Sequence, residues 1–261
     1  MNDTLSYQIE NGIATVTLNR PEKMNALSTD LFEALIEAGE AIKVDKSVRV
    51  VILHGAGKAF CAGLDMDLMK AVSDTDLKVR THGISNMFQQ VCWVWHEMPA
   101  PVIAAVHGTC FGGGLQIMTG ADIRYVHPDT KLSIMELKWG IVPDMAGTQL
   151  WSTYVREDIV RELTYTARIF SGTEAGEYGF ATRVCDDPLA AAQATAEQIA
   201  NKNPHAIRAA KRLINNQRQP DLAAGLMAES VEQMELMNTP NQLEAVKANF
   251  EKRAAKFTDP T

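Results

Sequence analysis

The chain has 261 residues, of which 46% are hydrophobic and 22% are charged, so it can bury a sizeable core as one large domain or one domain with an extension. Its formal net charge of -7, without a basic run, argues against a nucleic-acid-binding surface, which needs clustered Lys and Arg. No apolar stretch approaches the roughly 20 residues that span a bilayer, and the first residues lack the features of a signal peptide. The four cysteines form no CxxC pair, which indicates neither a disulfide framework nor a zinc site. We therefore expect a cytoplasmic protein without a metal or a membrane segment.

In chain order, strand-like and helical patterns alternate up to about residue 150, and helical patterns dominate afterwards. Asn11-Gly12 is a favoured two-residue hairpin turn, and Ser28 is a suitable N-cap for the helix that follows it. The predicted strands are 7–10, 13–18, 48–53, 102–106 and 122–126. The predicted helices are 29–43, 76–96, 115–120, 188–201, 205–215, 222–238 and 241–257. This order predicts an α/β fold, with a core over residues 1–195 and a helical C-terminal region over residues 196–261.

Three consecutive glycines, Gly112, Gly113 and Gly114, lie between the predicted strand 102–106 and the predicted helix 115–120. Glycine has no Cβ, so backbone N–H groups can come close to a ligand. A helix N-terminus adds partial positive charge at the same place. The combination suits a developing oxyanion, and the alternative is close packing of the helix against the strand.

Several segments carry a family resemblance. They are 19–27 (NRPEKMNAL), 59–65 (AFCAGLD), 101–108 (PVIAAVHG), 111–114 (FGGG), 140–143 (GIVP), 147–150 (GTQL) and 171–175 (SGTEA). Together they resemble the crotonase (enoyl-CoA hydratase/isomerase) superfamily in order and register over nearly the whole chain. The resemblance implies a spiral of ββα repeats with a C-terminal helical region that assembles trimers, often paired into hexamers. It also implies acyl-CoA chemistry without a separate cofactor, since coenzyme A is part of the substrate.

The resemblance assigns an oxyanion hole to two backbone N–H groups, those of Leu64 and Gly113. Removing a proton next to a thioester carbonyl creates an enolate, and losing one such donor typically costs about 3–4 kcal/mol in barrier. The alternative for Leu64 is a core leucine, and for Gly113 it is a packing position.

The acid/base residues depart from the family's hydratase pattern. Family hydratases have two glutamates, at the positions of Gln116 and Glu136 here. A glutamine can position water or substrate through hydrogen bonds, but it cannot take up a proton. A single glutamate at the second position resembles the enoyl-CoA isomerases, in which one carboxylate moves a proton between carbons. Because Glu136 lies in a largely apolar stretch, we expect it to be half-buried with a raised pKa. The alternative is a glutamate on an exposed strand face.

Asp144 occupies a second position that matters within the family. Dienoyl-CoA isomerases and naphthoate synthases carry an aspartate there, and chlorobenzoyl-CoA dehalogenase places its nucleophile there. The dienoyl-CoA isomerases also have an aspartate at the position of Gln116, so the match is incomplete. The alternative for Asp144 is an N-cap of a helix that begins near Met145.

Coenzyme A should be bound by local groups, because the overall charge repels a polyanion. The resemblance implies the following binding residues: Arg20, Lys23, Asn25, Ala26, Ala62 and Gly112. It further implies Phe250 and Lys252, which would reach coenzyme A from a neighbouring subunit. The alternative for Lys252 is a solvated charge on the last helix.

Three reactions therefore stay open. The first is double-bond isomerisation of an enoyl- or dienoyl-CoA, with Glu136 as the proton carrier and Asp144 assisting. The second is hydratase or lyase chemistry by Glu136 alone, with Gln116 orienting water. The third is dehalogenase- or hydrolase-like chemistry with Asp144 as nucleophile.

The expected partner is a small acyl-CoA, the expected assembly is a homotrimer or a dimer of trimers, and neither nucleic acid nor membrane is expected. The acidic charge balance disfavours the role of the family's RNA-binding relative, and retention of Glu136 disfavours a catalytically silent member.

Overall fold

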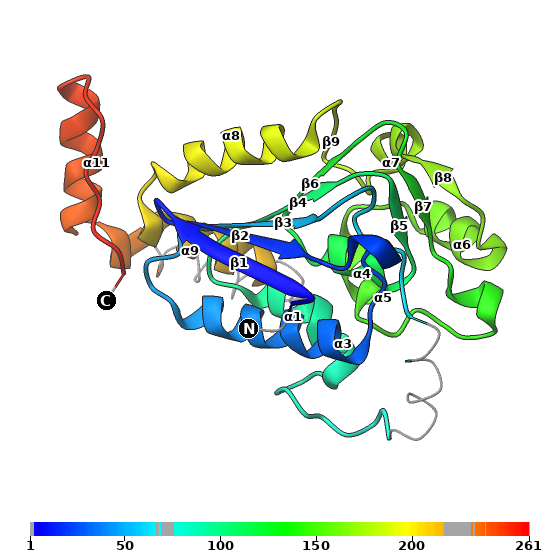
Figure 1. The fold of residues 1–261 in the computed structure, drawn as a ribbon. Coiled ribbons are helices and arrows are strands. Elements are labelled where there is room, and N and C mark those ends of the chain that lie inside the picture. Colours follow the sequence, from blue (N-terminus) through cyan, green and yellow to red (C-terminus); the bar gives the residue numbers. More distant parts are fainter. Residues whose placement is uncertain are drawn as a thin grey trace.

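The structure is a computed structural model that describes residues 3–65, 68, 76–216, 231, 233–237 and 239–260, with the backbone alone at Asn249 (Figure 1). The strands are β1 (Leu5–Glu10), β2 (Ile13–Leu18), β3 (Val50–Gly55), β4 (Val102–Val106), β5 (Thr109–Phe111), β6 (Ile123–Val126), β7 (Lys131–Ser133), β8 (Phe170–Ser171) and β9 (Arg183–Val184). The α-helices are α1 (Thr29–Val44), α3 (Met87–Glu97), α4 (Gly113–Thr119), α5 (Gly147–Leu150), α6 (Glu157–Thr166), α7 (Gly172–Tyr178), α8 (Pro188–Ala200), α9 (Pro204–Asn216) and α11 (Pro240–Phe250). Short 3₁₀ turns are η1 (Pro21–Lys23), η2 (Glu136–Trp139) and η3 (Trp151–Thr153).

The strands form two sheets that the chain visits in turn. The large sheet has the order β1-β2-β3-β4-β6-β9, and the small sheet has the order β5-β7-β8. After β4 the chain enters the small sheet as β5 and then forms α4, and after β6 it enters the small sheet again as β7. The pairs β2–β3, β3–β4, β4–β6 and β5–β7 are parallel. This repeated path confirms the predicted α/β spiral of ββα turns.

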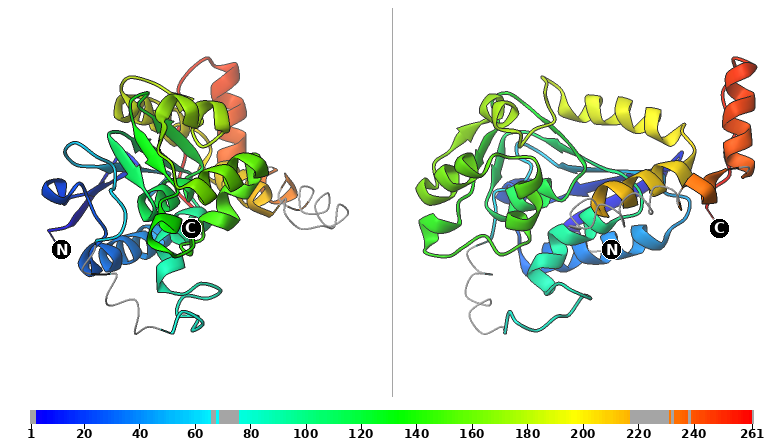
Figure 2. Two further views of the ribbon diagram at one scale, coloured as in Figure 1. Left: turned by 90° about the vertical axis from the view of Figure 1, so that its right-hand side faces the viewer. Right: turned by 180° about the vertical axis from the view of Figure 1, so that it is seen from behind.

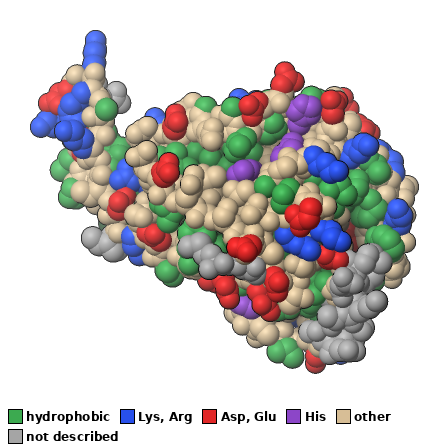
Figure 3. Space-filling view, in the orientation of Figure 1, with side chains coloured by type: hydrophobic (Ala, Val, Ile, Leu, Met, Phe, Trp, Pro, Cys, Tyr) green, Lys and Arg blue, Asp and Glu red, His purple; other side chains and the backbone are tan. Residues whose placement is uncertain are grey.

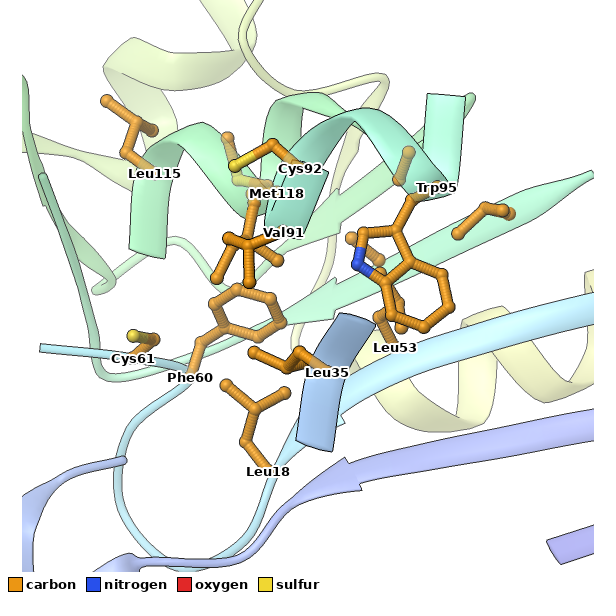
Figure 4. Close-up of a cluster of buried hydrophobic side chains, with 14 of the residues drawn as sticks. Leu18, Leu35, Leu53, Phe60, Cys61, Val91, Cys92, Trp95, Leu115 and Met118 are labelled. Carbon is orange, nitrogen blue, oxygen red and sulfur yellow. The ribbon is translucent and has the colours of Figure 1, made fainter. Parts of the chain in front are cut away.

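Both faces of the large sheet are covered, as the apolar run of β3 predicts. Val51 and Leu53 point into the main core, whereas Val50 and Ile52 pack toward α8. The alternation follows the two-residue period of a strand. On the main-core side, α1, α3 and α4 lie together, and their side chains enclose Phe60 (Figure 4). Phe60 and the adjacent Cys61 are both fully buried, so the segment that leads into the predicted oxyanion loop is fixed by the core.

Local signals placed several elements correctly. Asn11 and Gly12 form the β1–β2 turn with φ of 52° and 79°, and the Ser28 side chain accepts a hydrogen bond from the Leu31 N–H at the start of α1. The prediction of a helix over 76–96 is wrong for its first half. Asn86 forms a capping box with Gln89 and starts α3, so residues 76–86 are turns and irregular chain.

The C-terminal predictions need a similar correction. The helix predicted over 241–257 ends at Phe250, since Lys252 adopts φ of 53° and turns the chain back. Thr258 then bonds to Asn241, and Arg253 pairs with Glu244, which ties the returning tail to α11. Most of the helix predicted over 222–238 lies outside the described residues. The proposed boundary after residue 195 falls within α8, which packs on the sheet.

Helix α11 stands away from the body of the molecule in Figure 1 and in the right-hand view of Figure 2. Leu243, Val246 and Phe250 on this helix are exposed, with Phe250 at 85%. The space-filling view shows hydrophobic and charged side chains together on this projecting part (Figure 3). We call residues 240–260 the C-terminal arm.

Candidate active site

The predicted oxyanion loop is held on both sides by backbone hydrogen bonds. On one side, the Leu27 N–H donates to Gly63 O at 2.8 Å, and the Asp65 N–H donates to Leu27 O at 3.0 Å. This is a parallel bridge between Leu27 and Leu64, in which Leu64 directs its own N–H away from Leu27. On the other side, the Phe111 N–H donates to Cys61 O at 3.0 Å. The Leu64 N–H has no acceptor among the described residues, so it is available to a ligand.

The three glycines bring the second predicted donor next to the first. Gly112 has φ of 49° and precedes α4, whose first residue is Gly113. The N–H groups of a first helical turn have no partner within the helix, and a Cβ added to Gly63 would lie 3.9 Å from the Gly113 nitrogen. A Cβ on Gly114 would lie 2.5 Å from Cys61 O. Hence only glycine at 114 allows α4 to pack this closely on the oxyanion loop.

The residues that carry these two N–H groups, Leu64 and Gly113, line a cavity of ≈ 230 Å³. Five of the predicted site residues line it: Ala62, Leu64, Gly112, Gly113 and Glu136. The rest of its described lining consists of Gly63, Phe111, Met135, Lys138, Trp139 and Ile141. The structure therefore brings together one carboxylate, two backbone donors and an apolar wall, which is the composition expected of a small-molecule site.

Glu136 begins the η2 turn and is 7% exposed, so the alternative of an exposed glutamate is wrong. Its Oε1 accepts a hydrogen bond from Gln116 Nε2 at 2.6 Å, and its Oε2 is buried without a partner among the described residues. Burial raises the pKa of Glu136, and the nearby charge of Asp144 raises it further. A buried carboxylate oxygen without a donor is uncommon in proteins, and a raised pKa is typical of a group that exchanges protons.

Gln116 is buried on the first turns of α4, and both ends of its amide are bonded to protein. Its Nε2 donates to Glu136, and its Oε1 accepts hydrogen bonds from the N–H groups of Met145 and Gly147, both at 3.0 Å. Gln116 does not line the cavity. The predicted water- or substrate-positioning role therefore stays a prediction, while the observed contacts are to Glu136 and the 145–147 backbone.

Asp144 is half-buried near Glu136 but is not among the residues that line the cavity. Burial raises its pKa. The alternative of a helix cap is wrong, because α5 begins at Gly147 with Ala146 as its N-cap residue and without a side-chain cap. Asp144 therefore lies near Glu136 without lining the cavity, and its catalytic role stays a prediction.

Two predicted coenzyme A ligands have side chains that are bonded within the chain, and their contact with coenzyme A stays a prediction. Arg20 donates to Ala26 O and pairs with Asp65 at 3.2 Å. Asn25 is fully buried; its Nδ2 donates to Ala59 O at 2.8 Å, and its Oδ1 accepts from the Arg20 N–H. Both side chains thus brace the segment that carries Leu64.

The other predicted coenzyme A ligands lie in different places. Lys23 is exposed in η1, beside the braced segment, and Ala26 and Ala62 are half-buried there. Phe250 and Lys252 lie on the C-terminal arm, at the opposite end of the molecule from α4 and β5 (Figure 1). One chain therefore does not bring them to its own cavity, and their contribution to a neighbouring subunit stays a prediction.

The apolar wall of Met135, Trp139 and Ile141 was not predicted from the sequence. Trp139 is 49% exposed, and Lys138 Nζ lies 5.8 Å from the centre of its ring. Gly140, with φ of 73°, turns the chain between Trp139 and Ile141. The available signal was the Trp-Gly-Ile run that begins three residues after Glu136 and has neither strand nor helix periodicity.

The described residues have two further properties that concern the class of site. They contain no group of three or more His, Cys, Asp or Glu side chains arranged to hold a metal ion. Among the same residues, no helix has both the length and the apolar character to cross a membrane.

The chain is similar to known proteins over nearly its whole length. The enoyl-CoA hydratase/isomerase family profile matches residues 8–260. The mitochondrial Delta(3,5)-Delta(2,4)-dienoyl-CoA isomerase of Mus musculus is 32% identical over 252 residues, covering 92% of this chain and 77% of that protein. The mitochondrial methylglutaconyl-CoA hydratase of the same organism is 30% identical over 253 residues, covering 94% of this chain and 79% of that protein. The crystal structure of an enoyl-CoA hydratase from Bacillus anthracis has a TM-score of 0.87 at 32% identity, covering 97% of this chain and 98% of that one. The chain belongs to the enoyl-CoA hydratase/isomerase family, the crotonase superfamily.

Proposed function

We propose that this protein is an acyl-CoA double-bond isomerase in which Glu136 carries the proton. The observation that supports this most strongly is that Glu136 is the one carboxylate among the described residues that line the cavity. A single carboxylate suffices for moving a proton between two carbons of one substrate. Adding water across a double bond is assisted in family hydratases by a second glutamate, whose position here holds Gln116.

The proposed reaction moves one proton and one double bond. The Glu136 carboxylate takes a proton from C2 of a 3-enoyl thioester, and the electron pair spreads over the diene to the thioester oxygen. The Leu64 and Gly113 N–H groups donate to that oxygen as negative charge develops on it. The Glu136 carboxylic acid then returns the proton to C4, which leaves the double bond between C2 and C3. No oxidant, reductant or further cofactor is consumed.

The test is mass spectrometry of trans-3-hexenoyl-CoA and trans-2-hexenoyl-CoA after incubation with the protein in heavy water. We expect the 3-enoyl ester to become the 2-enoyl ester without the mass of an added water. Glu136→Gln should lower this rate by about 100- to 10,000-fold, the usual range for general acid–base catalysis. Glu33→Gln, an exposed glutamate on α1, is the matched control and should leave the rate unchanged.

Hydratase chemistry by Glu136 alone is the second candidate. It is favoured by the similarity to a methylglutaconyl-CoA hydratase and to an enoyl-CoA hydratase structure over nearly the whole chain. The same assay separates the two reactions, because water addition to the 2-enoyl ester without interconversion would reject the isomerase proposal.

Asp144 as a nucleophile is less well supported, since it does not line the cavity. Its proposed role is to help hold the pKa of Glu136 high through its charge. Asp144→Ala should therefore reduce turnover mildly, and a covalent acyl adduct at Asp144 would overturn this assignment.

Assembly and location are also proposals. A homotrimer or a dimer of trimers is supported by the exposed apolar side chains of the C-terminal arm and by the family resemblance. A cytoplasmic location is supported by four cysteines that are free thiols, three of them buried, as is typical of a reducing compartment.

A further inference from the structure

Gln116 connects two parts of the site that are far apart in the sequence. From α4, its amide reaches Glu136 on one side and the loop before α5 on the other. The side chain is 1% exposed, so water does not compete for these bonds. A buried amide with both ends bonded has one preferred orientation, because flipping it would place N–H groups against N–H groups.

The loop it holds has an unfavourable backbone conformation. Ala146 has φ of 68°, in the left-handed region that is unfavourable for a residue with a Cβ. The N–H groups on both sides of Ala146, those of Met145 and Gly147, donate to Gln116 Oε1 at 3.0 Å each. Such a conformation persists where its surroundings fix it, and one amide oxygen supplies both of these contacts.

Gly147 shows how closely this loop approaches Gln116. A Cβ added to Gly147 would lie 2.7 Å from Gln116 Oε1 and 2.8 Å from its Cγ. Both distances are too short for a real contact, so the loop can meet the glutamine only because residue 147 is glycine. The loop and the side chain are therefore fitted to one another.

The other end of the amide controls the oxygens of Glu136. Because Gln116 Nε2 donates to Oε1 at 2.6 Å, the carboxylate is fixed in rotation and Oε2 is left without a donor among the described residues. The other titratable groups near Glu136 are Asp144, Lys138 beside it on η2, and the thiol of Cys92 on α3. Burial raises the pKa of the Cys92 thiol, so it stays neutral. Gln116 is thus a neutral donor beside a carboxylate.

We propose that Gln116 is a positioning residue that locks Glu136 and the 145–147 loop together and, being neutral, leaves Glu136 as the single base of the site. This inference rests on the proposed function for its catalytic meaning. It differs from a water-holding role, since the Nε2 and Oε1 atoms are already bonded to protein. The inference also explains why glutamine stands where family hydratases have a glutamate. The glutamine keeps the structural contacts of the side chain and reduces the number of bases in the site from two to one.

Two variants separate the two ends of the amide. Gln116→Ala removes both the donor to Glu136 and the acceptor for the loop. Gln116→Glu keeps an acceptor for the Met145 and Gly147 N–H groups but places a second carboxylate about 2.6 Å from Glu136, where the pair must share a proton. Gln90→Ala is the matched control: Gln90 is another buried glutamine whose Nε2 donates to carboxylates, those of Glu40 and Glu97, outside the site.

The measurement is an infrared titration in which the band of the protonated Glu136 carboxyl group is recorded as a function of pH. The band is assigned by its loss in Glu136→Gln, and its midpoint is the pH at which half of the Glu136 side chains are protonated. We expect both Gln116 variants to shift its midpoint to higher pH, because a donor to the carboxylate is lost, with the larger shift in Gln116→Glu. The acid limb of kcat/KM should move in parallel, and kcat/KM of Gln116→Ala should fall by about tenfold or more. Gln90→Ala should change neither.

A midpoint and a pH–rate profile that stay at their wild-type values in both Gln116 variants would overturn the inference. If the wild-type protein does not isomerise 3-hexenoyl-CoA, the proposed function fails. The infrared titration still tests the Gln116 contacts in that case, because it needs no turnover.

Discussion

The oxyanion loop and the C-terminal arm of this chain are stabilised in opposite ways. The oxyanion loop is bonded on both sides within one chain. A Cβ added to Gly63 or Gly114 would lie 2.9 Å or 2.5 Å from a backbone oxygen, which is too close for any residue but glycine. The C-terminal arm projects from the body, and its last residues are held by a hydrogen bond from Thr258 to Asn241 and by an ion pair of Asp259 with Arg49. The side chain of Phe250 on this arm is 85% exposed. The geometry of the oxyanion loop is therefore set within one chain, whereas we expect residues on the arm to contribute to a site only when a second molecule covers them.

The largest effect should come from disturbing the loop through its closest contact. Gly114→Ala places a Cβ 2.5 Å from Cys61 O. Since that neighbour is backbone, the loop that presents the Leu64 N–H must shift. We expect kcat to fall by about 100- to 1,000-fold, as when one oxyanion donor is lost, in steady-state kinetics with 3-hexenoyl-CoA.

Gly83→Ala is the control for this loss. Gly83 has φ of 60° and nothing within 4 Å of an added Cβ, so it has the strain of a left-handed residue without a collision. If Gly114→Ala and Gly83→Ala lose activity equally, backbone disturbance anywhere in the chain lowers activity, and displacement of the oxyanion loop is not the specific cause. The proposed difference between the oxyanion loop and the C-terminal arm would then be wrong.

The arm should affect binding rather than chemistry. Phe250→Ala and Lys252→Ala should each raise KM for an acyl-CoA by about tenfold and leave kcat unchanged. About this much is expected from one charge-assisted contact for Lys252 and from burial of one aromatic side chain for Phe250. Lys247→Ala, an exposed lysine on the same helix, serves as the matched control. An unchanged KM in the two test variants would mean that the arm does not reach a neighbouring site.

The buried base should weaken the fold at neutral pH. Because the folded-state pKa of Glu136 is raised by burial, the native state binds more protons than the unfolded state between the two pKa values, and stability falls as pH rises through that window. Glu136→Gln removes the charge, so we expect the free energy of unfolding of this variant to be about 1 kcal/mol higher than that of the wild type at pH 7.

The gain should disappear below about pH 4, the range of an unperturbed glutamate. Urea unfolding at pH 7 and pH 4, at equal protein concentration, measures both values. Equal stability of variant and wild type at pH 7 would show that the carboxylate is solvated or paired, contrary to its observed burial.

The smallest effect should lie at the tail of the arm. Arg49 pairs with Asp259 at 2.7 Å, with side chains 19% and 41% exposed, and such partly exposed pairs contribute about 0.2–1 kcal/mol. Asp259→Asn should lower the free energy of unfolding by about 0.5 kcal/mol at low salt and by less at high salt. Asp186→Asn, an exposed aspartate, is the control. A loss of several kcal/mol would show that the tail is part of the core.

Local sequence signals predicted the elements that local chemistry determines. Asn11-Gly12, the Ser28 cap and the burial of Glu136 all follow from residue type and immediate neighbours. Strands β5, β7, β8 and β9 have two or three residues each, too few to show a period, and they exist because a partner strand lies beside them. The capping box at Asn86 was readable, but the apolar residues of 76–86 suggested a longer helix.

The candidate site divides in the same way. Leu64 and Gly113 could be predicted because the contiguous motifs 59–65 and 111–114 carry them, and Glu136 because its family position lies twenty residues after that of Gln116. The contacts of Gln116 with residues 145 and 147 could not, because one side chain joins positions that are 29 and 31 residues apart. The structural use of Arg20 and Asn25 was likewise invisible, since their partners Asp65 and Ala59 lie in another motif.

The central claim is that Glu136 removes a proton from C2 of a thioester substrate and that the two backbone N–H donors stabilise the enolate that results. The most direct measurement is exchange of the C2 protons of butanoyl-CoA in heavy water, followed by NMR, because this saturated ester can neither isomerise nor add water. We predict that the wild-type protein catalyses the exchange and that Glu136→Gln is slower by about 100-fold or more. Exchange that is absent from the wild type, or undiminished in Glu136→Gln, would contradict the claim.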